Sequence, residues 1–570
     1  MNTDYRFSEL VYTPTDFDAV RIRYENVIRQ IRDASSVDDV LAAIKEHDGI
    51  LDEVSYTSAL CYIRMSQHSL DEKLAEAVEY EFENAAQLPD AEFARALLES
   101  PFLPELEKRF GKEYRPRIEK DFRLKKAGLE LLAEEDQFMA MYQQKKAALR
   151  VSFRGKTYST GQMNAFLESP DRETRKEAKK AVLEAYLDKK DEFISFLQKT
   201  VKTRDALAKA NGFSDFASYM DVSYDRNGYG KKEIEAFCSE VKEQLVPLLT
   251  EIKRKKAEQL DLDKIMRYDA SLSFLDGNPV PIGGPEELTK AAITMYDSLS
   301  PELGTFFRNM VKTESLDVAP SNEKVSGMGF QTELNSNYLP FVFANCTGIA
   351  SDVDTFTHEI GHAWQQVSTW KAGLPSLFTS MPQDACEIPS RTMEMFTYPF
   401  AEEFFGKDAA KFRYSHFCTA LKEIADFCES HELETFTLTH PDVSFETLTE
   451  KALEIERAYN PDVDGGELEH FYQEGVSILQ SMPLYMVPFY GIGYALSWIC
   501  AMQFYQRFCE DREQALSVYN KLCSLGGSLS YPELLKAAGL KSPFEKGALQ
   551  ELVAFARKEL ARLEKEVSYE

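Results

Sequence analysis

The residues His358, Glu359 and His362 form an H-E-x-x-H arrangement, in which one helical turn separates two histidines. At about 100° per residue, positions i and i+4 of an α-helix differ by only about 40° around its axis, so both imidazole rings project from one face. Two such rings can bind one metal ion, and the glutamate beside them can take a proton from a metal-bound water. The spacing therefore indicates a metal-dependent hydrolytic site.

The residues around this motif favour a helix. Apolar side chains recur at helical spacing from Val353 to Val367, and Ser351 and Asp354 form an S-x-x-D capping pattern. Gly373 and Pro375 follow, and both are residue types that end helices. We therefore expect both histidines on one helix that begins near Ser351.

A catalytic zinc ion needs a third protein ligand, and Glu387 is the candidate. It opens the segment CEIPSRTMEMF, where Pro389 fits the first turn of a second helix. A helix, a loop and a second helix can return this carboxylate to the histidine face. A buried histidine pair without metal is the alternative, but two histidines, one carboxylate and an open fourth position are the pattern of catalytic zinc.

The stretch PFVFANCTGIASDVDTFTHEIGHAWQ, followed by ACEIPSRTMEMFTYPF, resembles the thimet oligopeptidase and oligoendopeptidase F family of zinc metallopeptidases. Within that family it is similar to the Pz-peptidase-like bacterial branch. The resemblance implies a mainly α, elongated helical protein with two lobes around a deep substrate channel and a small β-sheet beside the zinc helix. It also implies one Zn²⁺ per chain, held by His358, His362 and Glu387.

The length of 570 residues exceeds what one small core requires, so we expect two lobes. An N-terminal helical lobe over residues 1–200 would lie on the lid side of the channel, and a catalytic lobe over 201–570 would hold the zinc site. A hairpin is predicted near residues 150–160, where alternating residues flank a glycine-containing turn. Three charged amphipathic stretches predict helices: 19–34, 70–88 and 115–150.

A second extended segment, LPFVFANC at residues 339–346, directly precedes the zinc helix. It fits either a buried strand or an edge strand on which a peptide pairs through main-chain hydrogen bonds. The resemblance favours the edge strand, with Phe343 and Ala344 as substrate-binding residues.

Three tyrosines lie in the segment MPLYMVPFYGIGYALSW: Tyr485, Tyr490 and Tyr494. The resemblance implies that Tyr490 and Tyr494 are catalytic, as hydrogen-bond donors to the oxygen that gains charge in the transition state. Tyr485 is a weaker candidate for substrate binding, and packing is the alternative for all three. Relatives carry a histidine shortly before these tyrosines, whereas residues 475–494 contain none and His470 is the nearest.

Two carboxylates are candidates for orienting the ligands, because metal-bound histidines donate their second N–H to an acceptor. Glu394 lies two helical turns after Glu387, and Asp354 lies one turn before His358. A second His-Glu pair, His431 and Glu432, has Thr435 where another histidine would be needed, so we expect no metal there.

Composition limits the partners. The net charge of −28 disfavours nucleic acid, because binding a phosphate backbone needs a basic face. We find no apolar stretch of about eighteen residues and no signal segment at the N-terminus, so we expect no membrane partner and no secretion. Nine cysteines without a C-x-x-C pair fit reduced thiols, which predicts a cytoplasmic protein. Oligomeric state is not indicated.

With the resemblance, these residues predict a zinc-dependent endopeptidase that hydrolyses internal bonds of short oligopeptides, with Glu359 as general base. The restriction to short peptides is implied by the resemblance alone. A zinc carboxypeptidase of similar helical fold is the alternative, with Arg391, Lys371 or Arg267 binding the free C-terminus. A peptide-binding protein that merely retains the motif is the other alternative.

Overall fold

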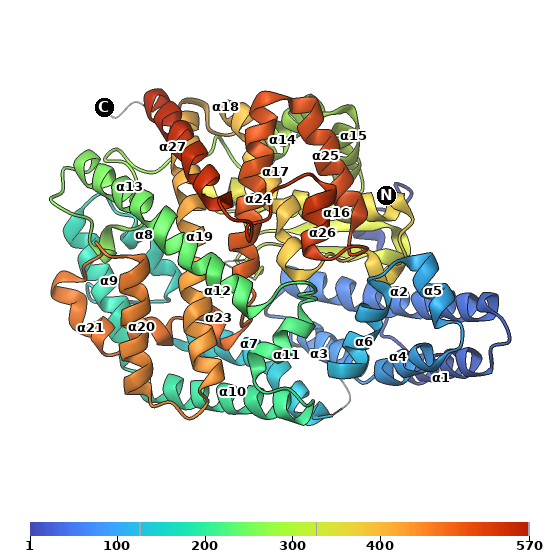
Figure 1. The fold of residues 1–570 in the computed structure, drawn as a ribbon. Coiled ribbons are helices and arrows are strands. Elements are labelled where there is room, and N and C mark those ends of the chain that lie inside the picture. Colours follow the sequence, from blue (N-terminus) through green and yellow to red (C-terminus); the bar gives the residue numbers. More distant parts are fainter. Residues whose placement is uncertain (125–126, 326–327, 568–570) are drawn as a thin grey trace.

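Helices make up most of the chain (Figure 1), and the described residues contain two small sheets, so the predicted mainly α fold is confirmed. The computed structural model describes residues 1–124, 127–325 and 328–567. Six helices, blue in Figure 1, form an N-terminal group: α1 (Phe17–Asp33), α2 (Val37–Gln67), α3 (Glu72–Ala86), α4 (Asp90–Glu99), α5 (Leu103–Phe110) and α6 (Tyr114–Leu124).

The middle of the chain begins with helix α7 (Leu129–Ala148). The helix predicted over residues 115–150 is therefore two helices, because Gly128 adopts a left-handed φ of 72° between them. The predicted hairpin is present, with β1 (Val151–Phe153) antiparallel to β2 (Lys156–Tyr158). The helices that follow are α8 (Asn164–Leu167), α9 (Arg172–Leu187), α10 (Lys190–Ala210), α11 (Phe216–Ser223), α12 (Lys231–Glu240), α13 (Val246–Gln259), α14 (Pro285–Leu299) and α15 (Pro301–Lys312).

The second sheet contains the segment that precedes the histidine motif. Its order is β3 (Leu316–Asp317), β5 (Leu339–Phe343) and β4 (Phe330–Leu334), with β5 parallel to β3 and antiparallel to β4. The expectation that LPFVFANC is an edge strand is wrong, since β5 is central and each of its residues is buried. The edge strands of this sheet are β3 and β4, and β4 packs beside the helix that carries the histidines.

That helix is α16 (Ala350–Ala372), and the next is α17 (Glu387–Phe396). The expected capping by Ser351 and Asp354 is wrong, because Asp352 accepts hydrogen bonds from the backbone N–H groups of residues 347–349. The remaining helices are α18 (Ala401–Phe405), α19 (Ala409–Thr439), α20 (Phe445–Tyr459), α21 (Glu469–Gln473), α22 (Val476–Leu479), α23 (Met482–Tyr485), α24 (Gly491–Glu510), α25 (Arg512–Leu525), α26 (Tyr531–Ala537) and α27 (Ala548–Glu566).

The largest hydrophobic core lies around α16, α17 and α24, where Phe356, Trp364 and Trp498 are buried. A second core joins side chains from both sides of residue 200, including Phe193 and Tyr485. The division into lobes at residue 200 stays a prediction. Within the described ranges, no helix combines the length and the apolar character needed to cross a bilayer.

Candidate metal centre and active site

Three side-chain atoms converge between α16 and α17. His358 Nε2 lies 3.1 Å and His362 Nε2 lies 3.2 Å from Glu387 Oε2, and the two nitrogens are 3.2 Å apart. For metal–ligand bonds of about 2.1 Å, ligands of a tetrahedral ion lie about 3.4 Å apart. The triangle therefore has nearly the size that a tetrahedral metal ion requires, and the structure brings together the three residues that the sequence predicts as ligands.

The contact between the two helices depends on Gly361, the fourth residue of the motif. A Cβ atom at this position would lie 2.6 Å from the Ser390 Cα atom and 2.8 Å from the Pro389 carbonyl oxygen. Only a residue without a side chain lets α17 approach α16 this closely. Because Glu387 is the first residue of α17, this approach carries its carboxylate to the histidines.

A carboxylate lies behind His358, the first candidate ligand. Glu394 Oε1 lies 2.7 Å from His358 Nδ1, and the same carboxylate accepts a hydrogen bond from Arg391. Burial by itself would raise the pKa of Glu394, but the charge of Arg391 and hydrogen bonds from His358 and His416 hold the pKa well below its usual range. The ionised carboxylate places a proton on Nδ1 and leaves the lone pair of Nε2 facing the triangle.

This donor arrangement fits a metal ion. The Nε2 lone pair of His358 points toward a carboxylate oxygen and a second imidazole nitrogen, each within 3.2 Å. Electron-rich atoms at such distances repel one another unless a proton or a metal ion lies among them, and a metal ion can satisfy all three at once. Imidazole and carboxylate ligands suit a divalent ion such as zinc.

His416 on α19 also belongs to this network, although the sequence did not indicate it. Its Nε2 lies 2.9 Å from Glu394 Oε2, and its Nδ1 lies 2.7 Å from the Tyr398 hydroxyl. Asp354 approaches His416 at 3.6 Å, and its Oδ1 atom accepts no hydrogen bond from the described residues. Burial raises the pKa of Asp354 to about 7 despite the opposing charge of His416.

Glu359 lies between the triangle and the edge strand β4. Its side chain is buried, and burial raises its pKa while the charges of His358 and His362 oppose the shift. A backbone hydrogen bond from Gln331 on β4 also acts on this carboxyl group. Gly329, just before β4, permits the contact, because a Cβ atom there would lie 2.4 Å from the Thr355 side chain of α16.

The predicted tyrosines divide into two sets. The Tyr490 hydroxyl donates to Glu387 Oε1 at 2.6 Å, and the Tyr494 ring lies 6.4 Å from the His358 ring. Tyr485 is fully buried in the second core, where it stacks on Tyr142 at 4.6 Å. The structure therefore places Tyr490 and Tyr494 at the triangle and leaves Tyr485 away from it.

Other predicted residues also lie away from the triangle. Phe343 is buried in the central strand β5 and stacks on Phe330, and Ala344 is buried directly after that strand. His470 is exposed on α21, where its ring contacts the Glu467 carbonyl oxygen and the Phe471 ring and none of the three predicted tyrosines among the described residues.

Comparisons with known proteins agree with this geometry. A family model described as Peptidase M3 N-terminal domain matches residues 7–124, and one described as Peptidase family M3 matches residues 165–273 and 302–554. The chain belongs to peptidase family M3. It is therefore a metallopeptidase, as the resemblance in its sequence implied. A search among curated proteins finds no match.

Three solved structures resemble this M3 peptidase over nearly its whole length. A putative oligoendopeptidase F is 30% identical, with a TM-score of 0.91 and coverage of 98% of this chain and 99% of that one. Pz peptidase A, solved with an inhibitor, is 29% identical, with a TM-score of 0.91 and coverage of 99% and 100%. A putative oligoendopeptidase F from Bacillus anthracis is 27% identical, with a TM-score of 0.86 and coverage of 98% and 99%.

In this M3 peptidase the turn before Tyr490 is held by buried charges that the sequence did not indicate. Phe489 has a left-handed φ of 64°, and its N–H donates to Glu434 on α19. Its carbonyl oxygen accepts from Arg226 at 2.9 Å, and Arg226 also donates to Asp384, three residues before Glu387, at 2.8 Å. Arg226 thus ties the turn that presents Tyr490 to the turn that presents Glu387.

The three basic residues considered for binding a free C-terminus all have carboxylate partners. Arg391 pairs with Glu394 and Glu423, and Lys371 pairs with Glu302 at 2.8 Å. Arg267 pairs with Glu456. None of these cations is left without an opposite charge in the M3 peptidase.

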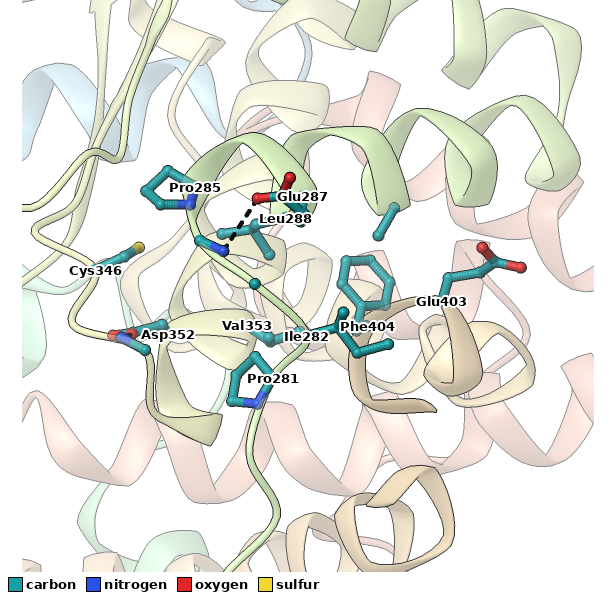
Figure 2. Close-up of a pocket in the computed structure, with 14 residues that line it drawn as sticks. Pro281, Ile282, Pro285, Glu287, Leu288, Cys346, Asp352, Val353, Glu403 and Phe404 are labelled. Atoms are coloured by element: carbon teal, nitrogen blue, oxygen red, sulfur yellow. Dashed lines mark hydrogen bonds between the residues drawn. The ribbon is translucent and has the colours of Figure 1, made fainter. Parts of the chain in front are cut away.

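Figure 2 shows a pocket where the start of α14 and the start of α16 meet the segment from Pro281 to Gly284. Its volume of about 30 Å³ has room for little more than a water molecule. Glu287 accepts a hydrogen bond from Gly284 N–H at 3.1 Å there, which caps α14. The pocket is a feature of helix capping, and no residue of the ligand triangle lines it.

Proposed function

We propose that this M3 peptidase is a zinc-dependent endopeptidase that hydrolyses internal bonds of short peptides. The proposal depends on one observation above all, the triangle of His358 Nε2, His362 Nε2 and Glu387 Oε2 with the Glu359 carboxyl beside it. Two imidazoles and one carboxylate leave a fourth position for water, which is the pattern of catalytic rather than structural zinc.

The residues divide the chemistry among them. Zinc held by His358, His362 and Glu387 would supply a water of lowered pKa and polarise the scissile carbonyl. Glu359 takes a proton from the attacking water and later delivers it to the leaving nitrogen, a role that its raised pKa supports. Tyr490 and Tyr494 donate hydrogen bonds to the oxygen that gains negative charge in the transition state.

Burial and the charge of Glu387 raise the pKa of Tyr490, so its hydroxyl keeps the proton that this role requires. In the structure that proton is directed at Glu387 Oε1, which leaves Oε2 facing the two histidines. Tyr490 therefore also fixes the orientation of the third ligand.

The peptide is proposed to pair with β4 instead of β5. Strand β4 is bonded to β5 along one side, and its other side faces Glu359. An extended peptide that adds to this edge through main-chain hydrogen bonds would bring a peptide bond past the carboxyl group with little demand on its side chains. The restriction to short peptides remains an expectation from the resemblance.

The proposed location is the cytoplasm. All nine cysteines are unpaired thiols, and six of them are buried. A chain of this length with no disulfide fits a reducing compartment.

Cleavage of an end-blocked, internally quenched peptide tests the proposal. The purified protein is assayed as prepared, after chelation, and after zinc is restored, beside the same peptide with a free C-terminus. Chelator-sensitive cleavage of the blocked peptide, regained with zinc, is the expected result. Cleavage of only the free-ended peptide would establish a carboxypeptidase, and metal binding without any cleavage would leave a peptide-binding protein.

A further inference from the structure

A cavity of about 660 Å³ lies among α9, α13, α19, α20 and the segment from α21 to α23. In Figure 1 these helices lie on the side of the molecule away from the N-terminal group α1–α6. The volume is in the range of small-ligand sites, about 300–1,000 Å³. The residues that line it do not include His358, Glu359, His362 or Glu387, so the cavity is separate from the candidate metal centre.

The walls of the cavity carry an excess of positive charge. Five basic side chains line it, against three acidic ones: Lys179, Lys253, Lys256, Arg267 and Lys422, against Asp426, Glu429 and Glu456. This balance is unexpected in a chain whose net charge is −28. We refer to the site as the lysine cavity.

Two of the five cations are neutralised by neighbours in the wall. Lys422 donates to Asp426, and Arg267 Nη2 donates to Glu456 Oε2 at 2.9 Å. The third acid, Glu429, accepts from an asparagine, and burial together with the charge of Glu456 raises its pKa to about 8. Near pH 7 Glu429 is therefore mostly protonated and balances little of the remaining positive charge.

The other three lysines have no acidic partner among the described residues. Lys253 donates to the Asn460 side-chain oxygen at 2.7 Å, and Lys256 donates to the Ala270 carbonyl at 2.8 Å. Lys179 has no hydrogen-bond or ion-pair partner in the described chain. An ammonium group carries three N–H donors, so each of these lysines keeps donors for a ligand.

Two further observations indicate an anionic occupant. Burial lowers the pKa of Lys179 and Lys253, and it lowers that of Lys256 to about 8, so a bound anion would stabilise their charged forms. Tyr472 also lines the cavity, and its hydroxyl is buried without a hydrogen-bond partner in the described residues.

The cavity adjoins the turn that presents Tyr490. Ser430, a lining residue, donates to Glu434 Oε1 at 2.7 Å, and Glu434 accepts the N–H of Phe489. Met482 and Pro483 of α23 line the cavity a few residues before this turn. The cavity is thus linked, through Ser430 and Glu434, to the turn that presents Tyr490 at the ligand triangle.

We propose that the lysine cavity binds a carboxylate-bearing segment of the peptide substrate, an inference that rests on the peptidase function proposed above. Lys179, Lys253 and Lys256 supply the charged N–H donors. The preference is for acidic side chains or a free carboxyl terminus over uncharged residues.

Equilibrium binding of fluorescent peptides tests this without turnover when Glu359→Gln protein is used. The two peptides of a pair have the same sequence except at two positions, where one carries Glu and the other Gln. Each peptide is made with a free C-terminal carboxyl group and with a C-terminal amide. The expected preference for the Glu peptide is at least about 10-fold at low salt, and inorganic phosphate should compete with the Glu peptide only. If the preference follows the free acid instead, the bound carboxylate is the C-terminus.

The matched variants are Lys253→Gln/Lys256→Gln and, as control, Lys546→Gln/Lys558→Gln, two exposed lysines outside the cavity. The cavity variant should lose the preference for carboxylates, and the control should keep it. Equal loss in both would show a general field effect and overturn the site, as would absence of any preference in the unaltered cavity. Cleavage of a neutral blocked peptide by wild-type protein tests the peptidase function separately.

Discussion

The chain contains two consecutive His-Glu pairs on long helices. In the described structure, carboxylates from a neighbouring helix meet the histidine of only one pair. On α16, His358 meets the Glu387 and Glu394 carboxylates of the neighbouring helix α17. On α19, His431 lies against the Phe489 ring at 5.5 Å, and its Nδ1 has no hydrogen-bond partner among the described residues. Glu432 accepts hydrogen bonds from Lys242 and from the Tyr459 hydroxyl.

The difference shows where the chemistry of such a pair originates. A histidine becomes a candidate ligand when a second element brings carboxylates to both of its ring nitrogens, as α17 does for His358. Without that element burial dominates, and it lowers the pKa of His431 to about 3, so the ring stays neutral. The motif gives the spacing, and Gly361 gives the helix contact that completes the site.

Replacing each histidine in turn gives the largest contrast. His358→Gln removes one ligand of the triangle, and we expect metal content to fall and kcat/KM to drop by roughly 10³-fold, since several kcal/mol of transition-state stabilisation depend on the metal. His431→Gln should retain its metal and stay within about threefold of wild type. Metal analysis and peptide kinetics on both variants check this, and similar losses in both would end the distinction between the pairs.

Tyr490 lies where the two regions meet, because it contacts Glu387 and follows Phe489. We expect Tyr490→Phe to lower kcat by about 10²-fold, the usual effect of losing one donor to a developing oxyanion, with metal content retained. Tyr485→Phe is the control and should leave kcat and KM unchanged, since that ring is buried in the second core. An unchanged kcat in Tyr490→Phe would remove the tyrosine from the mechanism.

Glu394, the carboxylate behind His358, can be compared with a carboxylate away from the candidate metal centre. Glu394→Gln should weaken metal affinity by about 10- to 100-fold, because the oriented Nδ1 proton of His358 loses its charged acceptor. Glu402→Gln, at an exposed pair with Arg413, should leave metal affinity unchanged. Competition with a metal-binding dye measures both, and equal affinities would reduce Glu394 to a packing residue.

The neutral ring of His431 predicts a small dependence of stability on pH. Its pKa is about 3 in the folded chain and near 6.5 when unfolded, so below pH 6.5 the unfolded chain binds the proton more readily. This contribution to stability is complete above pH 6.5 and declines as pH falls, by at most about 1.4 kcal/mol per pH unit. Denaturant unfolding between pH 7 and 4.5 should show a shallower loss for His431→Gln, and parallel curves would contradict the assignment.

The ligand set could be predicted from the sequence because its geometry is local. His358 and His362 are one turn apart on one helix, and Glu387 and Glu394 are two turns apart on the next. The helical fold followed from amphipathic periodicity for the same reason. Two helical predictions were wrong: the cap of α16 is Asp352 and not Asp354, and residues 115–150 form two helices because of the left-handed Gly128.

What the sequence did not indicate depends on contacts between distant segments. A buried run such as LPFVF does not reveal whether a strand pairs on one side or on both. The sequence therefore did not indicate that β5 is central and that β4 lies at an edge. His416 and Arg226 reach the site from α19 and from the segment after α11, and no local pattern connects them to Glu394 or Asp384. Tyr485 has the same residue type as Tyr490, but only the packing separates their environments.

The most direct test of the central claim compares Glu359→Gln with Glu432→Gln, the same change in the two His-Glu pairs. Both proteins are loaded with zinc, and turnover of an end-blocked quenched peptide is measured together with metal content. We predict full metal occupancy in both, with kcat about 10³-fold lower only in Glu359→Gln. Full turnover by metal-loaded Glu359→Gln would show that Glu359 is not the general base and would contradict the account.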